Sequence, residues 1–231
     1  MAKHNLHHLA IIPDGNRRWA RKHGLPTFEG HRKGFEAARK LVKYARTVGI
    51  HTLTLWAFST ENWERTKEEV GYLMRLYAEM TDKYLDEAEK EKVRIIHLGR
   101  KDRIPDYLLA KVENAEEETK NFTQNVLNIA LDYGGRDEIL RAINRIQNSE
   151  FRVQSLNESN FNEFLDTKGQ PYPSPDLIIR TSGEMRISGL MIWQTAYSEL
   201  LFLDKHFPDM TTADIDLAIR EFAQRQRRFG K

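Results

Sequence analysis

Residues 9–20 read LAIIPDGNRRWA, an apolar run that stops at Asp14 and continues as a basic segment. The run predicts a buried strand, and the basic segment predicts a helix. Gly15 tolerates backbone conformations that other residues avoid, so the loop between them can turn its N–H groups outward. With Arg17 and Arg18, those donors suit a phosphate or diphosphate. Asp14 would repel this anion unless a divalent cation lay between them, and Mg²⁺ is the usual one. The alternative is that Asp14 caps the helix and the arginines are solvated.

Short apolar strands alternate with amphipathic helices through the rest of the chain. The strands are expected at 9–12, 50–58, 93–98, 126–131, 177–179 and 199–203. Helices are expected at 31–48, 67–92, 107–121, 137–147, 158–165 and 212–228. This alternation predicts an α/β fold with a central, mostly parallel sheet and helices on both faces. We expect a single domain over residues 1–231, with residues 148–175 forming a polar connection.

The composition limits the class of protein. The chain has 231 residues, a net charge of +2 and no cysteine, so disulfides and thiolate metal sites are excluded. No apolar run approaches the length of about 20 residues that a membrane helix needs, and no signal peptide is evident, so we expect a cytoplasmic protein. The basic residues are too evenly spread to indicate nucleic acid as a partner.

A second anion site is predicted after the strand at 177–179. The sequence there reads DLIIRTSGEMRIS over residues 176–188, which places Arg180, Arg186 and Ser188 in one loop. Two guanidinium groups and a hydroxyl suit a second phosphorylated ligand. Ligands of parallel sheets gather at the carboxyl ends of the strands, so this loop and the Asp14 loop are expected to converge.

These motifs, together with FSTENW at 58–63, IWQ at 192–194 and AYSEL at 196–200, resemble the cis-prenyltransferases, the undecaprenyl diphosphate synthase family. The resemblance runs from about Leu9 to Gly230. It implies a homodimer with a hydrophobic tunnel that condenses isopentenyl diphosphate with an allylic diphosphate in the presence of Mg²⁺. It also implies peripheral membrane contact when the product is released. The aspartate-rich motif of the trans-prenyltransferases is absent.

The resemblance also assigns roles to individual residues. The allylic diphosphate is expected over Gly15, Asn16, Arg17, Arg18 and Trp19, near His31, and isopentenyl diphosphate on Arg180, Arg186, Ile187 and Ser188. Mg²⁺ is expected on Asp14 and Glu199, although Glu199 could equally form an ion pair at a strand end. Asn62 is expected where the isopentenyl unit loses its proton. The residues expected to line the site there are Ser59, Thr60, Glu61, Trp63 and Arg65. Because an amide is a poor base, we expect Asn62 to orient the substrate or relay the proton. Its alternative role is that of a turn residue that caps the helix after Trp63.

Some positions depart from the family pattern. Pro13 stands where the family often has methionine, and Gly189 stands where it often has asparagine. Thr27 stands where many members have an arginine that binds the allylic diphosphate. The allylic primer and the product length are therefore open, with a medium-length product favoured over a short or irregular one. A non-catalytic partner subunit of the same fold is a further alternative, which the presence of Asp14, Asn62 and both arginines disfavours. A nucleotide-binding domain is disfavoured because neither Gly-x-Gly-x-x-Gly nor a P-loop occurs.

Overall fold

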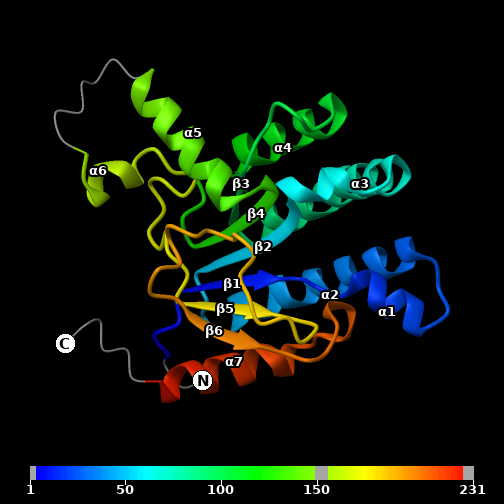
Figure 1. Cartoon of the computed structure of the whole chain (residues 1–231). Helices are drawn as coiled ribbons and strands as arrows, with labels where there is room; N and C mark the ends of the chain where they lie inside the picture. The colour runs from blue at the N-terminus through cyan, green and yellow to red at the C-terminus, as the bar shows by residue number, and fades with distance from the viewer. Residues whose placement is uncertain (1–3, 149–155, 226–231) are drawn as a thin grey trace.

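A computed structural model describes residues 4–148 and 156–225. Its centre is a sheet of six parallel strands in the order β3-β4-β2-β1-β5-β6 (Figure 1). The strands are β1 (His8–Ile12), β2 (Thr52–Ser59), β3 (Val93–Leu98), β4 (Asn125–Tyr133), β5 (Leu177–Arg180) and β6 (Glu199–Phe202). The predicted α/β class, the parallel sheet and each predicted strand are confirmed.

Seven α-helices and two short 3-10 helices connect or flank the described strands. They are α1 (Asn16–Lys22), α2 (Thr27–Thr47), η1 (Thr60–Glu64), α3 (Lys67–Lys90), α4 (Asp106–Thr119), α5 (Gly135–Gln147), α6 (Glu158–Asn162), η2 (Phe207–Asp209) and α7 (Thr212–Gln224). Helix α2 begins at Thr27 rather than at the predicted His31, because Pro26 serves as its N-cap in an extended conformation. The last helix was predicted to reach Arg228, and its part beyond Arg225 lies outside the described residues.

The two faces of the sheet are covered differently. On one face Leu9, Leu53 and Leu177 pack with side chains of α2 and α7 in the largest cluster of buried side chains. On the other face Ala10 and Ile178 pack against Leu190 and Met191, which belong to the irregular segment before β6. Side chains that alternate between faces in this way are the expected result of the strand's two-residue period.

The outer edge of β3 is protected by α4. The backbone N–H of Ile95 donates to Thr119 Oγ1 at 2.9 Å, and that of His97 donates to Glu116 Oε1 at 2.9 Å. An unpaired strand edge invites pairing with other chains, and these side chains satisfy donors that a neighbouring strand would otherwise take. In Figure 1 the strands point toward α1, which lies at the carboxyl edge of the sheet.

Strand β2 contains a bulge near its carboxyl end. Trp56 pairs with Ala130 and Phe58 with Leu131, so Ala57 is an extra residue in β2. The carbonyl oxygen of Ala57 accepts a hydrogen bond of 2.6 Å from the Tyr77 hydroxyl on α3. The bulge therefore fastens α3 to the sheet where β2 passes into η1.

Candidate active site

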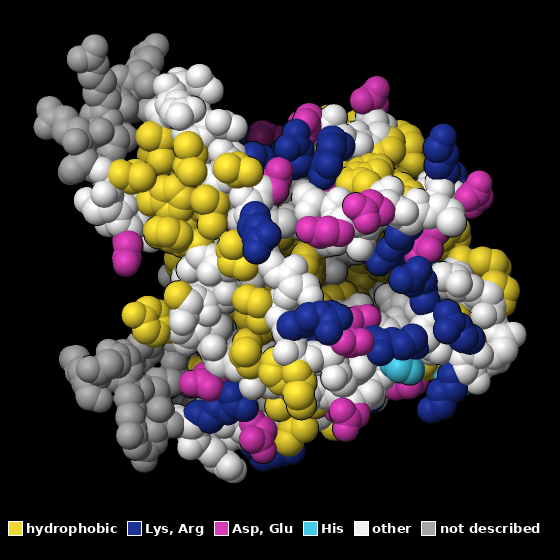
Figure 2. Space-filling model, in the orientation of Figure 1, with side chains coloured by type: hydrophobic (Ala, Val, Ile, Leu, Met, Phe, Trp, Pro, Cys, Tyr) yellow, Lys and Arg dark blue, Asp and Glu magenta, His cyan; other side chains and the backbone are white. Residues whose placement is uncertain are grey.

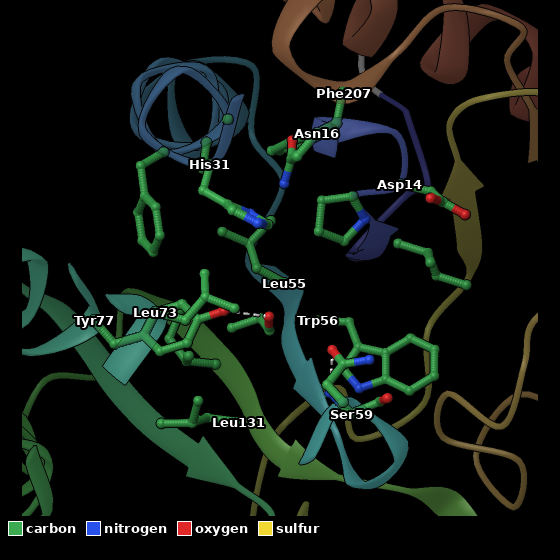
Figure 3. A pocket seen from close by; sticks show the side chains of 18 of the residues that line it. Asp14, Asn16, His31, Leu55, Trp56, Ser59, Leu73, Tyr77, Leu131 and Phe207 are labelled. Atoms are coloured by element: carbon green, nitrogen blue, oxygen red, sulfur yellow. Dashed lines mark hydrogen bonds between the residues drawn. The ribbon is translucent and has the colours of Figure 1, made fainter. Parts of the chain in front are cut away.

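One large cavity opens at the carboxyl edge of the sheet and extends between the sheet and helices α2 and α3 (Figure 3). Its volume is about 930 Å³. We call its charged opening the mouth; it is lined by residues 14–18 and by Ser59, Glu61, Asn62, Arg65, Arg180, Glu184, Arg186 and Ser188. We call its apolar depth the interior; its walls include Leu55, Leu73, Tyr77, Met80, Tyr84 and Leu131.

The two predicted anion loops meet at the mouth because β1 pairs with β5. The Thr181 and Ser182 hydroxyls donate to the carbonyl oxygen of Asp14 at 2.7 and 2.9 Å. Gly15 has φ +99°, and a Cβ there would lie 1.9 Å from Ser182 Oγ. A glycine is therefore required both by the left-handed backbone and by the closeness of the second loop.

Asp14 is the acidic centre of the mouth. Its carboxylate accepts from Arg180 Nη2 at 3.0 Å and pairs with Arg18 Nη2 at 3.2 Å. Burial alone would raise the pKa of Asp14, but the hydrogen bond from Arg180 and the charges of both arginines outweigh it, and the pKa is lowered. The side chain is 31% exposed, so an ionised carboxylate faces the cavity.

The second anion loop is organised by Arg180, whose side chain is only 6% exposed. Its Nη1 donates to Ser188 Oγ at 2.7 Å and to the carbonyl oxygen of Arg186 at 2.5 Å. Its Nε is buried without a hydrogen-bond partner. Arg186, by contrast, is 61% exposed and pairs with Glu184 at 2.6 Å. One arginine therefore shapes the loop, and the other extends from it.

Glu69 on α3 joins three predicted site residues but was missed in the sequence. Its carboxylate lies 3.0 Å from Arg65 Nη1, 3.3 Å from His31 Nε2 and 3.8 Å from Arg17 Nη1. Burial is the largest influence on His31 and lowers its pKa, which favours a neutral imidazole. The four-residue spacing from Arg65 was the available signal for Glu69. Its contacts to α1 and α2 needed the fold.

Asn62 lines the mouth and also caps η1. Its Oδ1 accepts from the Ser59 backbone N–H at 3.2 Å, and Ser59 reciprocates toward the N–H of Asn62. The predicted alternative, a cap on the helix after Trp63, is wrong: Thr66 caps that helix, α3, and accepts from the Glu69 backbone N–H at 3.3 Å. The proposed role of Asn62 toward the substrate stays a prediction.

Some predicted site residues do not line the cavity. Trp19 donates from its indole to Asp209 at 2.7 Å, and Trp63 donates to Asp132 at 2.8 Å, so both indoles hold elements together. Ile187 packs against the core cluster of Ala10 and Met191. Thr60 likewise is not among the residues that line the cavity. The motifs therefore lie in segments that reach the cavity, but they do not predict the direction of each side chain.

Glu199 is not brought to Asp14 within the chain, contrary to our expectation. It pairs with Leu177 at the start of β5, whereas Ile12, just before Asp14, pairs with Arg180 at the end of β5. The two carboxylates therefore lie at opposite edges of the sheet. Glu199 instead pairs with Arg225 at 2.8 Å, which is the alternative that the sequence left open.

Residues 4–148 and 156–225 contain no group of three or more His, Asp or Glu side chains arranged to hold a metal ion. No helix in these ranges has both the length and the apolar character needed to cross a membrane.

Comparisons with known proteins show the family to which the chain belongs. A family model described as putative undecaprenyl diphosphate synthase matches residues 12–230. An isoprenyl transferase of Thermotoga maritima is 47% identical over 225 residues, which cover 96% of each chain. One of Fusobacterium nucleatum is 44% identical over 230 residues, covering 100% of this chain and 98% of its own.

Solved structures are similar over nearly the whole chain. The crystal structure of lavandulyl diphosphate synthase from Lavandula x intermedia, in complex with dimethylallyl diphosphate, has a TM-score of 0.93 at 34% identity and covers 98% of both chains. That of a probable undecaprenyl diphosphate synthase from Campylobacter jejuni has a TM-score of 0.81 at 34% identity and covers 100% of both chains. The chain belongs to the undecaprenyl diphosphate synthase family and is a cis-prenyltransferase.

Proposed function

We propose that this enzyme condenses isopentenyl diphosphate with an allylic prenyl diphosphate to give a Z-configured prenyl diphosphate, with Mg²⁺ as cofactor. The observation that carries the proposal is the cavity itself, because two loops rich in arginine meet at the mouth of a deep apolar interior. A substrate with a charged head and a hydrocarbon tail matches both parts. One catalytic domain over residues 1–231 is proposed.

The two diphosphates are assigned to the two loops. We place the allylic diphosphate over Gly15 to Arg18, and isopentenyl diphosphate on Arg180, Arg186 and Ser188. The complex of the lavandulyl relative with dimethylallyl diphosphate supports an allylic diphosphate as one substrate. Arginine forks suit phosphate oxygens because they can donate two parallel hydrogen bonds.

Asp14 is the residue proposed to hold Mg²⁺. Its carboxylate is ionised, partly exposed and directed at the mouth, which fits a cation held by one carboxylate and substrate phosphate oxygens. When bound, the cation would stabilise the negative charge that develops on the departing diphosphate. Arg17 and Arg18 add donors to the same oxygens. Asn62 orients the isopentenyl unit as its proton is lost, and the diphosphate is the expected acceptor.

The interior is proposed to receive the growing chain, as the predicted hydrophobic tunnel. Met80, Tyr84 and the small Ala57 all line the cavity. We propose that Met80 and Tyr84 close its far part and that Ala57 leaves room near the mouth. We favour a medium-length product, with a short or irregular product as the alternative. The family resemblance implies no insertion between Glu61 and Gly99 relative to bacterial medium-chain members, which argues against a much longer product.

A homodimer is proposed as the working assembly. Apolar side chains gather over α5 and α6 in Figure 2, where Leu140 is 62% and Ile143 38% exposed. Nearby, Trp193 is 37% exposed while its indole still bonds Asn162. Large exposed apolar side chains are typical of protein interfaces. A monomeric mass at micromolar concentration with full activity would contradict this assembly. The predicted cytoplasmic location and peripheral membrane contact stay proposals.

The function is tested by incubating the purified protein with Mg²⁺, radiolabelled isopentenyl diphosphate and a panel of allylic primers. We expect labelled prenyl diphosphates with new double bonds of Z geometry. Chromatography measures their chain length. EDTA should abolish the product. No labelled product with any primer would contradict the proposal and favour a non-catalytic subunit of the same fold.

A further inference from the structure

Glu184 belongs to the second anion loop, and its carboxylate contacts one arginine from each loop. Its Oε1 accepts from Arg18 Nη1 at 3.1 Å, and its Oε2 accepts from Arg186 Nη1 at 2.6 Å. Arg18 belongs to the first loop and helix α1, and Arg186 belongs to the second loop. With Asp14 between Arg18 and Arg180, the mouth contains an unbroken row of alternating charges: Arg186, Glu184, Arg18, Asp14 and Arg180.

The loop that carries Glu184 is fixed at both ends. Ser182 has φ +75° and is held by the Asp14 carbonyl oxygen, His206 and Lys205. Ser188 has φ +49° and accepts from Arg180. Such left-handed residues persist where the surrounding contacts determine the backbone. The two ends of the loop are therefore fixed by contacts other than those that Glu184 makes to Arg18 and Arg186.

We infer that the Glu184 carboxylate is an internal substitute for a substrate phosphate, which holds Arg18 and Arg186 until a diphosphate displaces it from each. A carboxylate with two oxygens, each on a different guanidinium, offers the acceptor geometry that phosphate oxygens offer. The hydrogen bond from Arg186, followed by the charges of Arg186 and Arg18, lowers the pKa of Glu184, so it is ionised.

The exposure of the three side chains shows that displacement is feasible. Glu184 is 27% exposed, Arg18 41% and Arg186 61%. Ion pairs at such exposure contribute little net stability, because water competes for both partners. A diphosphate carries more charge and more acceptor oxygens than one carboxylate, so a diphosphate at either loop can replace Glu184 on the arginine of that loop. Glu184 would therefore weaken the binding of an anion at either loop, because the anion must first displace the carboxylate.

The test is the affinity for inorganic diphosphate, measured calorimetrically in EDTA so that only protein contacts contribute. Glu184→Gln removes the competing charge, and we expect diphosphate to bind about threefold to tenfold more tightly than to wild type. Glu184→Asp keeps the charge but shortens the side chain, and should give an intermediate affinity. Glu68→Gln is the matched control, because Glu68 is exposed on the nearby α3 and its loss changes the net charge equally.

A second comparison tests the bridge itself. In an Arg186→Ala background, Glu184→Gln should improve diphosphate binding less than it does in wild type, because one of the two contested guanidinium groups is gone. An unchanged or weaker affinity of Glu184→Gln relative to Glu68→Gln, with both proteins melting at the wild-type temperature, would overturn the inference. A lower melting temperature with weaker binding would assign Glu184 a structural role and overturn it equally.

The inference rests on the proposed assignment of two diphosphates to the two loops. The binding experiment requires no turnover, so the two ideas can fail separately. If the enzyme makes no prenyl product but Glu184→Gln tightens diphosphate binding, the substitute stands and the proposed function fails. If product forms normally but the affinity does not rise, the reverse holds.

Discussion

The mouth and the interior of one cavity satisfy their polar groups in opposite ways. At the mouth, charged side chains pair with one another, as Asp14 does with Arg18 and Arg180. In the interior, polar side chains bond to backbone carbonyl oxygens: Tyr77 to Ala57 at 2.6 Å and Tyr84 to Phe35 at 3.3 Å. Side-chain pairs can exchange for a ligand, whereas backbone acceptors stay occupied. The interior therefore offers an apolar surface to a ligand although it contains tyrosines.

Asp14→Ala is expected to have the largest effect on activity, because it removes the negative charge at the centre of the mouth. Turnover should fall by about a hundredfold or more, since the loss corresponds to several kcal/mol of charge stabilisation in the transition state. Asp14→Asn keeps an acceptor for Arg180 but lacks the charge, and should be equally inactive while remaining folded. Steady-state rates with Mg²⁺ provide the measurement, and near-normal activity of the pure alanine variant would refute the mechanism.

Arg180→Ala should reduce both stability and activity, because Arg180 is nearly buried and contacts both loops. We expect the free energy of unfolding in urea to fall by about 2–3 kcal/mol, the cost of removing charge-assisted hydrogen bonds and leaving Asp14 without that partner. The partial exposure of Asp14 keeps this below the cost for a fully buried pair. An unfolding curve that overlays the wild type would show that Arg180 does not organise the loop.

Arg186→Ala should separate substrate binding from stability. Its guanidinium is exposed, so the unfolding curve should not move, whereas the KM for isopentenyl diphosphate should rise about tenfold to a hundredfold, corresponding to about 1.5–3 kcal/mol. The KM for the allylic primer should change much less. Equal increases in both Michaelis constants would contradict the assignment of one diphosphate to each loop.

His8 provides a buried polar group far from the mouth, at the amino end of β1. Burial lowers its pKa to about 4, outweighing its hydrogen bond to the Tyr172 carbonyl oxygen. As the pH falls from 6.5 toward 4, the unfolded chain takes up a proton that the folded chain refuses, so stability is lost on acidification. Between pH 7 and pH 5, wild type should lose about 2 kcal/mol more unfolding free energy than His8→Gln. Parallel pH dependences in urea titrations would assign the acid sensitivity to other groups.

The sheet and the mouth were largely predictable from sequence. Hydrophobic period, loop chemistry and strand ends each have a local signal, and these gave the six strands and the convergence of the Asp14 and Arg180 loops. Boundaries were less predictable. The first turns of helix α2 contain Gly30 and Gly34, which interrupt the apolar periodicity, so the periodicity did not predict that the helix begins at Thr27.

The direction of single side chains was not predictable. Trp19 and Trp63 lie in the right segments, yet their indole N–H groups bond to Asp209 and Asp132, partners distant in sequence. Glu199 likewise follows from a motif, but only the parallel register shows that it lies at the opposite edge from Asp14. Periodicity also could not distinguish a cavity wall from a packed core, since both present the same apolar face of α3.

The separation of mouth from interior is tested most directly by measuring product length and the KM for isopentenyl diphosphate on one protein, Met80→Ala/Tyr84→Ala. Both side chains line the interior, and the Tyr84 hydroxyl donates to the Phe35 carbonyl oxygen at 3.3 Å. Tyr84→Phe, which loses only that hydrogen bond, is the control. At saturating substrates the double variant should make longer products at an unchanged KM, because the interior deepens and the mouth does not change. An unchanged product distribution in a stable, active double variant, or a raised KM with it, would contradict the account.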